Sequence, residues 1–256
     1  MLVIPAIDLK DGQCVRLRQG RMDEATIFSN NPIEMAGRWL DQGARRLHVV
    51  DLNGAFSGTL VNAQTVAEIA KAYPELSIQI GGGIRNLDSV KFYMDSGVDF
   101  VIIGTAAIKD PEFLVKACDM FPEKIIVGVD AIEGKVATEG WADISEVSTV
   151  ELIGRFLDTG VAAVIYTDIS RDGMMKGCNI EATIELASQS QIPIIASGGV
   201  AKLADIVDLK AAARSSSGIG IGIIGVITGR AIYEGTLDLR EAQKYCDGED
   251  SKNDFS

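Results

Sequence analysis

The chain of 256 residues repeats itself as two similar halves, and this repeat restricts the fold more than any other feature. Asp8 ends an apolar run near the N-terminus, and Asp130 ends a second apolar run at the matching place in the other half. Asp51 and Asp168 continue the match at a spacing of 117 residues, and glycine clusters recur later in both halves. Each half is too long for one solenoid repeat, so the pattern indicates a duplicated half-domain.

Short runs of valine and isoleucine alternate with amphipathic stretches along the whole chain. Runs without polar alternation are typical of strands buried on both faces of a parallel sheet. Eight strand–helix units in about 250 residues predict an α/β fold, a (β/α)8 TIM barrel built from two duplicated half-barrels. The rival is a doubly wound sheet, which two matching halves disfavour. We predict strands near 2–7, 46–51, 77–80, 100–103, 124–129, 163–167, 193–196 and 221–227, and helices near 32–43, 61–73, 86–96, 110–120, 148–159, 179–189, 202–213 and 238–246.

Composition sets the domain count and excludes several functions. An apolar content of 47% is enough for one large core, so we expect a single domain over 1–246 and an acidic, disordered tail over 247–256. No apolar stretch reaches the roughly 18 residues of a membrane span, and the N-terminus lacks a basic signal-peptide start. A formal charge of −12 argues against nucleic acid or an anionic membrane as a partner. We therefore expect a cytoplasmic protein.

Cysteine and histidine usage argues against a metal site. The four cysteines are dispersed without CxxC spacing, which indicates reduced thiols, and His48 is the only histidine. The glycine clusters also lack the arrangement of a dinucleotide-binding fingerprint. We expect neither a metal nor a cofactor.

Glycines follow the predicted third, fourth, seventh and eighth strands. Taken singly, each cluster suits a tight turn between a strand and a helix. In a TIM barrel, however, the C-terminal ends of the strands carry the active site. Glycine lets backbone N–H groups approach a phosphate closely, and the next helix adds its positive N-terminus. Since the clusters recur in both halves, they predict two phosphate sites, formed by Gly82, Gly83, Gly104 and Thr105 and by Gly198, Gly199, Gly229 and Arg230.

Asp8 and Asp130 end the first and fifth strands, which lie opposite each other in an eight-stranded ring. A strand-end aspartate often only caps the following loop. Two such carboxylates facing each other between two phosphate sites instead favour a division of acid and base work. Asp51 and Asp168 are weaker candidates, because each suits a role in anchoring a loop.

The combined motifs resemble one family over about residues 1–246. This family is the phosphoribosylformimino-aminoimidazole-carboxamide ribotide isomerase of histidine biosynthesis, a half-barrel duplication whose substrate carries two phosphates. The resemblance implies an Amadori rearrangement of an aminoaldose to an aminoketose, without metal or redox cofactor. The matching segments are Ile4-Pro-Ala-Ile-Asp-Leu, Cys14-Val-Arg-Leu-Arg-Gln-Gly, His48-Val-Val-Asp-Leu, Gly81-Gly-Gly-Ile-Arg, Gly104-Thr-Ala, Glu139-Gly-Trp, Tyr166-Thr-Asp-Ile-Ser-Arg-Asp-Gly, Ala196-Ser-Gly-Gly-Val and Gly229-Arg-Ala-Ile-Tyr-Glu-Gly.

The same resemblance implies roles for individual residues. Asp8 would be the general base that takes the proton from ribose C2′, and Asp130 the general acid that assists ring opening. Thr167 and Asp172 would complete the catalytic group. Substrate contacts would come from the remaining positions, among them a first loop that closes over the substrate and an aromatic over the imidazole. These positions are Arg16, Gln19 and Gly20 in the loop, Trp141 as the aromatic, and Arg85, Asp168 and Ser197 beside the glycines.

Three alternatives stay open. One is the related cyclase subunit of imidazole glycerol phosphate synthase, which normally reads Cys-Leu-Asp in its first strand and needs a glutaminase partner. Another is a bifunctional isomerase that also accepts phosphoribosylanthranilate, and the third is an idle phosphate-binding module. Ala6-Ile-Asp8, Glu139-Gly-Trp141 and Tyr166-Thr-Asp168 favour the isomerase over the cyclase, and the intact Asp8 and Asp130 disfavour the idle module. The sequence does not separate the isomerase from the bifunctional enzyme, and the isomerase would need no obligate protein partner. The unusual segments 174–179 and 212–222 depart from the family pattern.

Overall fold

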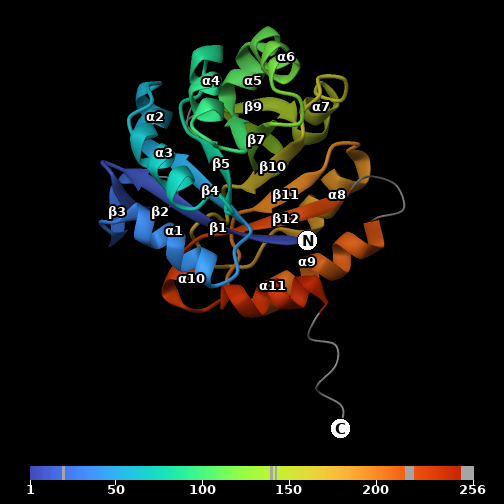
Figure 1. Ribbon diagram of the computed structural model, residues 1–256. Helices are drawn as coiled ribbons and strands as arrows, with labels where there is room; N and C mark the ends of the chain where they lie inside the picture. The colour runs from blue at the N-terminus through green and yellow to red at the C-terminus, as the bar shows by residue number, and fades with distance from the viewer. Residues whose placement is uncertain (19–20, 139–140, 142, 217–221, 249–256) are drawn as a thin grey trace.

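Eight parallel strands form the centre of the molecule and close into a barrel (Figure 1). The computed structural model describes residues 1–18, 21–138, 141, 143–216 and 222–248. The barrel strands follow the predicted runs of valine and isoleucine closely. They are β1 (Leu2–Lys10), β4 (Arg46–Asp51), β5 (Ser77–Gly81), β6 (Phe100–Ile103), β7 (Ile125–Ile132), β10 (Ala163–Asp168), β11 (Ile194–Ser197) and β12 (Ile223–Thr228).

The strand pairing distinguishes the barrel from its rival. Strand β1 pairs in parallel with β12 on one side and with β4 on the other, and β7 pairs likewise with β6 and β10. The remaining parallel pairs complete the ring. The predicted TIM barrel is confirmed, and the doubly wound alternative is wrong. Because three strands separate β1 from β7 on either side, these two strands lie opposite each other.

Helices surround the strands (Figure 1), and side chains cap the first turns of several of them. The Asn31 side chain accepts from the Glu34 amide, and Asp110 accepts from the Phe113 amide, each just before a proline in the first turn. The eight helices that the sequence predicts are α1 (Pro32–Asp41), α3 (Ala63–Ala72), α4 (Leu87–Asp95), α6 (Pro111–Met120), α7 (Thr149–Gly154), α8 (Ile180–Gln189), α9 (Leu203–Ser216) and α11 (Leu239–Asp247).

Several of these helices differ from their predicted ends, and α9 runs to Ser216 instead of residue 213. Helix α7 stops at Gly154, although the pattern predicts helix to residue 159. After Gly154 the backbone hydrogen bonds join residues three apart, as in Thr159 N–H to Phe156 O, instead of the four apart of an α-helix. Helix α11 includes Asp247, which the sequence assigned to the tail and which pairs with Arg45 at 2.7 Å. Residues 249–256 lie outside the described part of the chain. None of the described helices is both long and apolar enough to cross a membrane.

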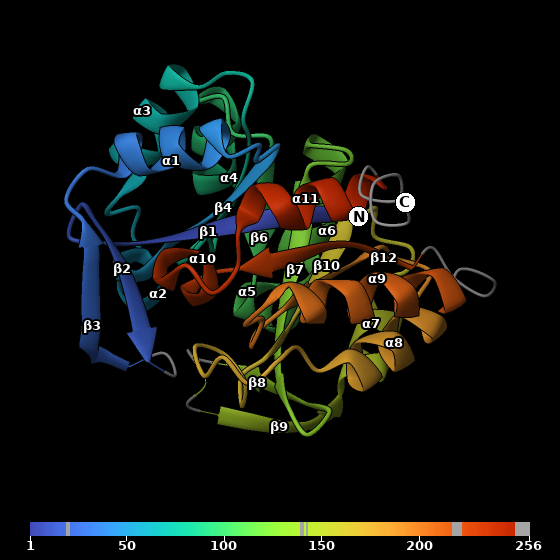
Figure 2. The ribbon, with the colours of Figure 1, turned by 90° about the horizontal axis from the view of Figure 1, so that it is seen from below.

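Two β-hairpins that the sequence did not predict follow opposite barrel strands. The first consists of β2 (Gln13–Arg18) and β3 (Arg21–Ser29), the second of β8 (Lys135–Thr138) and β9 (Asp143–Ser148). Figure 2 shows both hairpins projecting from the same side of the molecule. Their registers match, because Asp8 pairs with Val15 and Asp130 pairs with Ala137. The duplication therefore extends into the hairpins.

Buried apolar side chains form two separate layers, one outside the barrel and one inside it. The outer layer lies between strands and helices and contains the large buried side chains of Trp39 and Tyr93. The inner layer fills the interior of the barrel, as expected for a packed core rather than a pore. It consists of Ile4, Ala6, Ile102, Ile126, Ala163, Ile165, Ile195 and Ile227.

Candidate active site

Asp8 and Asp130 lie near the ends of opposite barrel strands, and each is held by a group from the hairpin that follows it. For Asp8 this group is charged: Arg16 on β2 places its Nη1 2.9 Å from Asp8 Oδ2. Both side chains are largely enclosed, with 13% of Arg16 and 16% of Asp8 exposed. A charge-assisted contact of this kind stabilises the ionised carboxylate.

Asp130 is held by neutral donors instead. Trp141 donates its Nε1–H to Asp130 Oδ2 at 2.8 Å, and the Thr167 hydroxyl bonds to the same carboxyl group. Thr167 is directly paired with Asp130 in the parallel register of β10 and β7. The two halves of the molecule thus treat their aspartates differently, one with a cation and the other with uncharged hydrogen-bond donors.

Burial raises the pKa of both aspartates, but the opposing influences differ. At Asp8, the Arg16 guanidinium lowers the pKa and the Asp172 carboxylate raises it. At Asp130, the hydrogen bonds from Trp141 and Thr167 lower the pKa and Asp172 raises it. Since only Asp8 has a cation beside it, the arrangement favours a proton on Asp130 before one on Asp8.

Asp172 completes a group of three partly buried carboxyls. It lies in the loop after β10 and acts electrostatically on both Asp8 and Asp130. Burial raises the pKa of Asp172, whereas Arg16 and a backbone hydrogen bond from Gly173 lower it. The structure thus brings together all four predicted catalytic residues. Asp172 lies close enough to Asp8 and Asp130 to influence both electrostatically, and Thr167 bonds to Asp130.

The glycine pairs after β5 and β11 have backbone conformations that other residues rarely adopt. Gly82 has φ +105° and Gly198 has φ +94°. A Cβ at Gly82 would lie 2.2 Å from Asp51 O, and one at Gly198 would lie 2.6 Å from Asp168 O. Each turn therefore packs backbone against backbone, which only glycine permits.

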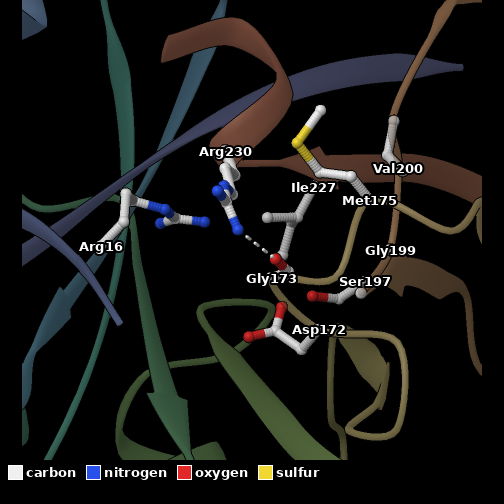
Figure 3. Close-up of a pocket in the computed structure, with 11 residues that line it drawn as sticks. Arg16, Asp172, Gly173, Met175, Ser197, Gly199, Val200, Ile227 and Arg230 are labelled. Carbon is white, nitrogen blue, oxygen red and sulfur yellow. Dashed lines mark hydrogen bonds between the residues drawn. The ribbon is translucent and has the colours of Figure 1, made fainter. Parts of the chain in front are cut away.

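A pocket lies at the predicted second phosphate site (Figure 3). Arg230, which begins helix α10 (Arg230–Glu234), points its guanidinium toward that of Arg16, with Asp172 beside them. Arg230 Nη1 also donates to Gly173 O at 3.0 Å. Two guanidinium groups facing one space supply N–H donors that suit an anionic ligand, while Arg16 also pairs with Asp8 and Arg230 with Glu234. The lining residues are Arg16, Asp172, Gly173, Met175, Ser197, Gly198, Gly199, Val200, Ile227, Gly229 and Arg230.

The predicted first phosphate site, in the first half of the chain, resembles the second in its glycine and short helix. Gly104 precedes the short helix α5 (Thr105–Lys109), as Gly229 precedes α10, and neither glycine offers a side-chain cap. The first N–H groups of both helices are therefore not capped by the preceding side chain. Arg85, also predicted here, donates to Ala55 O at 3.0 Å in the neighbouring short helix α2 (Leu52–Ser57).

Asp51 and Asp168 anchor loops in both halves. Asp51 accepts from the Asn62 side chain at 2.7 Å, and Asp168 accepts from the Asn179 side chain at 2.6 Å. Asp168 also accepts from the Ser170 amide and hydroxyl. These contacts match the loop-anchoring role weighed from the sequence, and a substrate contact by Asp168 stays a prediction.

Other predictions have different outcomes. Gln19 and Gly20 lie outside the described residues. All four cysteines are free and buried, and no group of three or more possible metal ligands occurs in the described part of the chain. Sequence reasoning did not select Gly173, Val200 or Ile227 as site residues, although each lies next to a predicted residue or at a strand end. Position at the C-terminal end of a strand was the signal that would have found Ile227.

Comparison with known proteins agrees with the resemblance drawn from the motifs. The family of histidine biosynthesis proteins matches residues 2–238. Three curated relatives carry the name 1-(5-phosphoribosyl)-5-((5-phosphoribosylamino)methylideneamino)imidazole-4-carboxamide isomerase. The relative from Hahella chejuensis is 62% identical over 96% of this chain and 99% of its own length. Those from Ectopseudomonas mendocina and Azotobacter vinelandii are 60% and 59% identical, over 96% and 97% of this chain and 98% and 99% of their own.

Proposed function

Because this chain belongs to the family of histidine biosynthesis proteins, we propose that it is the isomerase that its relatives are named for. Its reaction is the Amadori rearrangement of the bis-phosphorylated ribosylformimino-aminoimidazole-carboxamide ribotide, from aminoaldose to aminoketose. The cyclase alternative is not favoured, since the relatives at about 60% identity are named as isomerases over nearly their full length.

The observation that carries the proposed mechanism is the different environment of the two opposed aspartates. An aminoaldose in its ring form opens when an acid protonates the ring oxygen and the bond to C1′ breaks. A base then removes the proton from C2′, and the resulting enolamine becomes the ketose. One carboxyl must therefore start protonated and the other ionised.

We assign the acid to Asp130 and the base to Asp8. The Arg16 cation at 2.9 Å favours the ionised form of Asp8, so this carboxylate is ready to accept a proton. Asp130 is partly buried among neutral partners and lies near the negative Asp172, so it holds its proton more strongly. The Trp141 indole and the Thr167 hydroxyl orient the acid.

We assign the two substrate phosphates to the two glycine sites. The second site gains the charges of Arg16 and Arg230, and the first uses Gly82, Gly83, Gly104 and Thr105. Held at both ends, the reacting sugar is oriented between Asp8 and Asp130, and this orientation contributes to the rate. The purified chain alone is expected to turn over substrate, because both carboxyls and both phosphate sites come from one barrel.

A steady-state assay with Asp8→Asn and Asp130→Asn tests the proposal. Asparagine keeps the shape of aspartate but exchanges no proton at neutral pH, so each variant is expected to lose about 10²- to 10⁴-fold in kcat. Asp119→Asn, an exposed aspartate on α6, is the matched control and keeps full activity. If either active-site variant keeps near wild-type turnover while it remains folded, the role assigned to that aspartate is wrong.

The choice of substrate is tested in the same assay. Both the ribosylformimino ribotide and phosphoribosylanthranilate are offered to the wild-type protein. Turnover of the first alone supports the proposed function, whereas turnover of both identifies a bifunctional isomerase. Turnover of neither rejects the proposal.

A further inference from the structure

Tyr233 lies on α10 behind the second phosphate site, where three other elements meet its side chain. Its ring packs against Phe28 of β3, with 4.8 Å between the ring centroids, and meets Trp39 of α1 edge-on at 5.1 Å. Its hydroxyl donates to Ala6 O at 3.1 Å, two residues before Asp8 on β1. Tyr233 thus joins the first hairpin, an outer helix and the strand of the proposed base.

The same ring forms one wall of the space that holds Arg16. The guanidinium carbon of Arg16 lies 5.9 Å from the Tyr233 ring centroid, within the range of a cation–π contact. On a second side the guanidinium pairs with Asp8. On a third side it lies against Gly229, where a Cβ would come within 1.4 Å of Arg16 Nη2.

We propose that Tyr233 is a positioning residue of the reaction, whose ring keeps the Arg16 guanidinium on Asp8. This inference rests on the proposed function, because it assumes that Asp8 is the base. Arginine has a long side chain with several rotatable bonds, and holding it in one position costs conformational entropy. An aromatic wall restricts the positions of the Arg16 side chain and thereby keeps the cation beside the carboxylate.

The expected consequence is a change in the pH dependence. The charged and titratable groups facing Asp8 and Arg16 are Cys14, His48, Asp172, Arg230 and Tyr233. Burial and Arg16 lower the pKa of His48 to about 3, and burial and Asp8 raise that of Cys14 to about 12, so neither titrates near neutrality. Tyr233 has a raised pKa, mainly through burial, and stays neutral as well.

The direction of the change follows from the charge of Arg16. Arg16 lowers the pKa of Asp8, so a less constrained Arg16 lets that pKa rise. A base must be ionised to act, so the acidic limb of kcat/KM moves to higher pH when the Tyr233 ring is lost. A purely structural role would instead lower kcat/KM by a similar factor at every pH.

The experiment compares variants that separate the ring from the hydroxyl. Tyr233→Leu and Tyr233→Met remove the ring, and we expect the acidic limb to move up by roughly half to one pH unit. Below the limb, kcat/KM then falls by about 3- to 10-fold. Tyr233→Phe keeps the ring and leaves the limb in place. Both variants remove the ring, so the test needs only one of them to fold.

Two controls make the test specific. Tyr245→Leu removes a comparable pair on α11, where Lys210 Nζ lies 4.6 Å from the ring centroid, and keeps the wild-type pH profile. In an Arg16→Met background, Tyr233→Leu causes no further movement of the limb, since both changes remove the same influence. An additive further movement, or an unmoved limb in both ring-deleted variants, overturns the proposal.

A crystal structure of Tyr233→Leu provides a readout that does not depend on activity. We expect Arg16 to leave Asp8 in at least part of the molecules, and an unchanged ion pair would overturn the proposal. A wild-type protein without isomerase activity would reject the proposed function instead, so the two failures are distinguishable.

Discussion

Replacing Gly82 with alanine should destabilise the protein far more than the removal of a surface glycine. The left-handed backbone at Gly82, with φ +105°, costs an alanine about 1–2 kcal/mol. The added Cβ would also lie 2.2 Å from Asp51 O and 2.8 Å from Asp51 N, both backbone atoms that move only with their strand. Such overpacking costs about 1–3 kcal/mol more. The expected loss in free energy of unfolding is therefore about 2–5 kcal/mol.

Gly12→Ala is the matched control. Gly12 also has a left-handed backbone, with φ +76°, but a Cβ there would meet nothing within 4 Å. This variant should lose only the backbone contribution, about 1–2 kcal/mol. Gly198→Ala should resemble Gly82→Ala, because its Cβ would lie 2.6 Å from Asp168 O.

Urea denaturation of the three variants measures these differences directly. In a thermal scan, each kcal/mol corresponds to about 2–4 °C in Tm for a chain of this size. If Gly82→Ala loses no more stability than Gly12→Ala, the close backbone contact is not what requires glycine. The packing argument for the whole glycine turn would then be refuted.

Two further predictions concern the acid and the phosphates. Trp141→Phe removes the 2.8 Å bond that lowers the pKa of Asp130, so this pKa should rise. Because Asp130 is proposed to act in its protonated form, the alkaline limb of kcat/KM should move to higher pH, and an unmoved limb contradicts the assignment. In a crystal soaked with inorganic phosphate or sulfate, we expect two bound anions, and anions found only elsewhere on the surface would count against the two-phosphate substrate. The expected positions are beside Gly82, Gly83, Gly104 and Thr105 and beside Gly198, Gly199, Gly229 and Arg230.

The barrel was predictable because its signal is local and repeated. Runs of valine and isoleucine mark each strand, and a strand in a parallel sheet tolerates few polar residues on either face. Asp8 and Asp130 were identified because they interrupt such runs at matching places. Their opposite positions then follow from the number of strands in the ring.

The hairpins were missed although a local signal for them exists. Asp11-Gly12 and Glu133-Gly134 have φ values of +52°, +76°, +50° and +77°, the backbone of a two-residue hairpin turn. The Asp-Gly pair is a strong hairpin signal in a sequence. The polar strand β2, with Arg16 and Arg18, resembles a loop when only apolar runs are counted.

The side chains that contact Asp8 and Asp130 could not be predicted from the sequence, for a different reason. The bond between Trp141 and Asp130 depends on how the second hairpin folds back over its strand, and no short-range pattern encodes that distance. The ion pair of Arg16 with Asp8 depends likewise on the register that sets Val15 opposite Asp8. A lone tryptophan or arginine in a polar segment suits a loop anchor or a solvated surface equally well.

The two hairpins also give the molecule exposed strand edges that a closed barrel lacks. In the described part of the chain, β3 pairs only with β2 and β9 only with β8, so each has unpaired backbone groups along one side. An exposed edge of this kind can pair with a strand of another chain, and charged side chains on the edge usually prevent such pairing. Asp143 and Glu146 supply such charges on β9, where Ile144 is 50% exposed. Neutralising these acidic residues would therefore open a route to edge-to-edge aggregation, and it would begin at the end of the barrel that carries the active site.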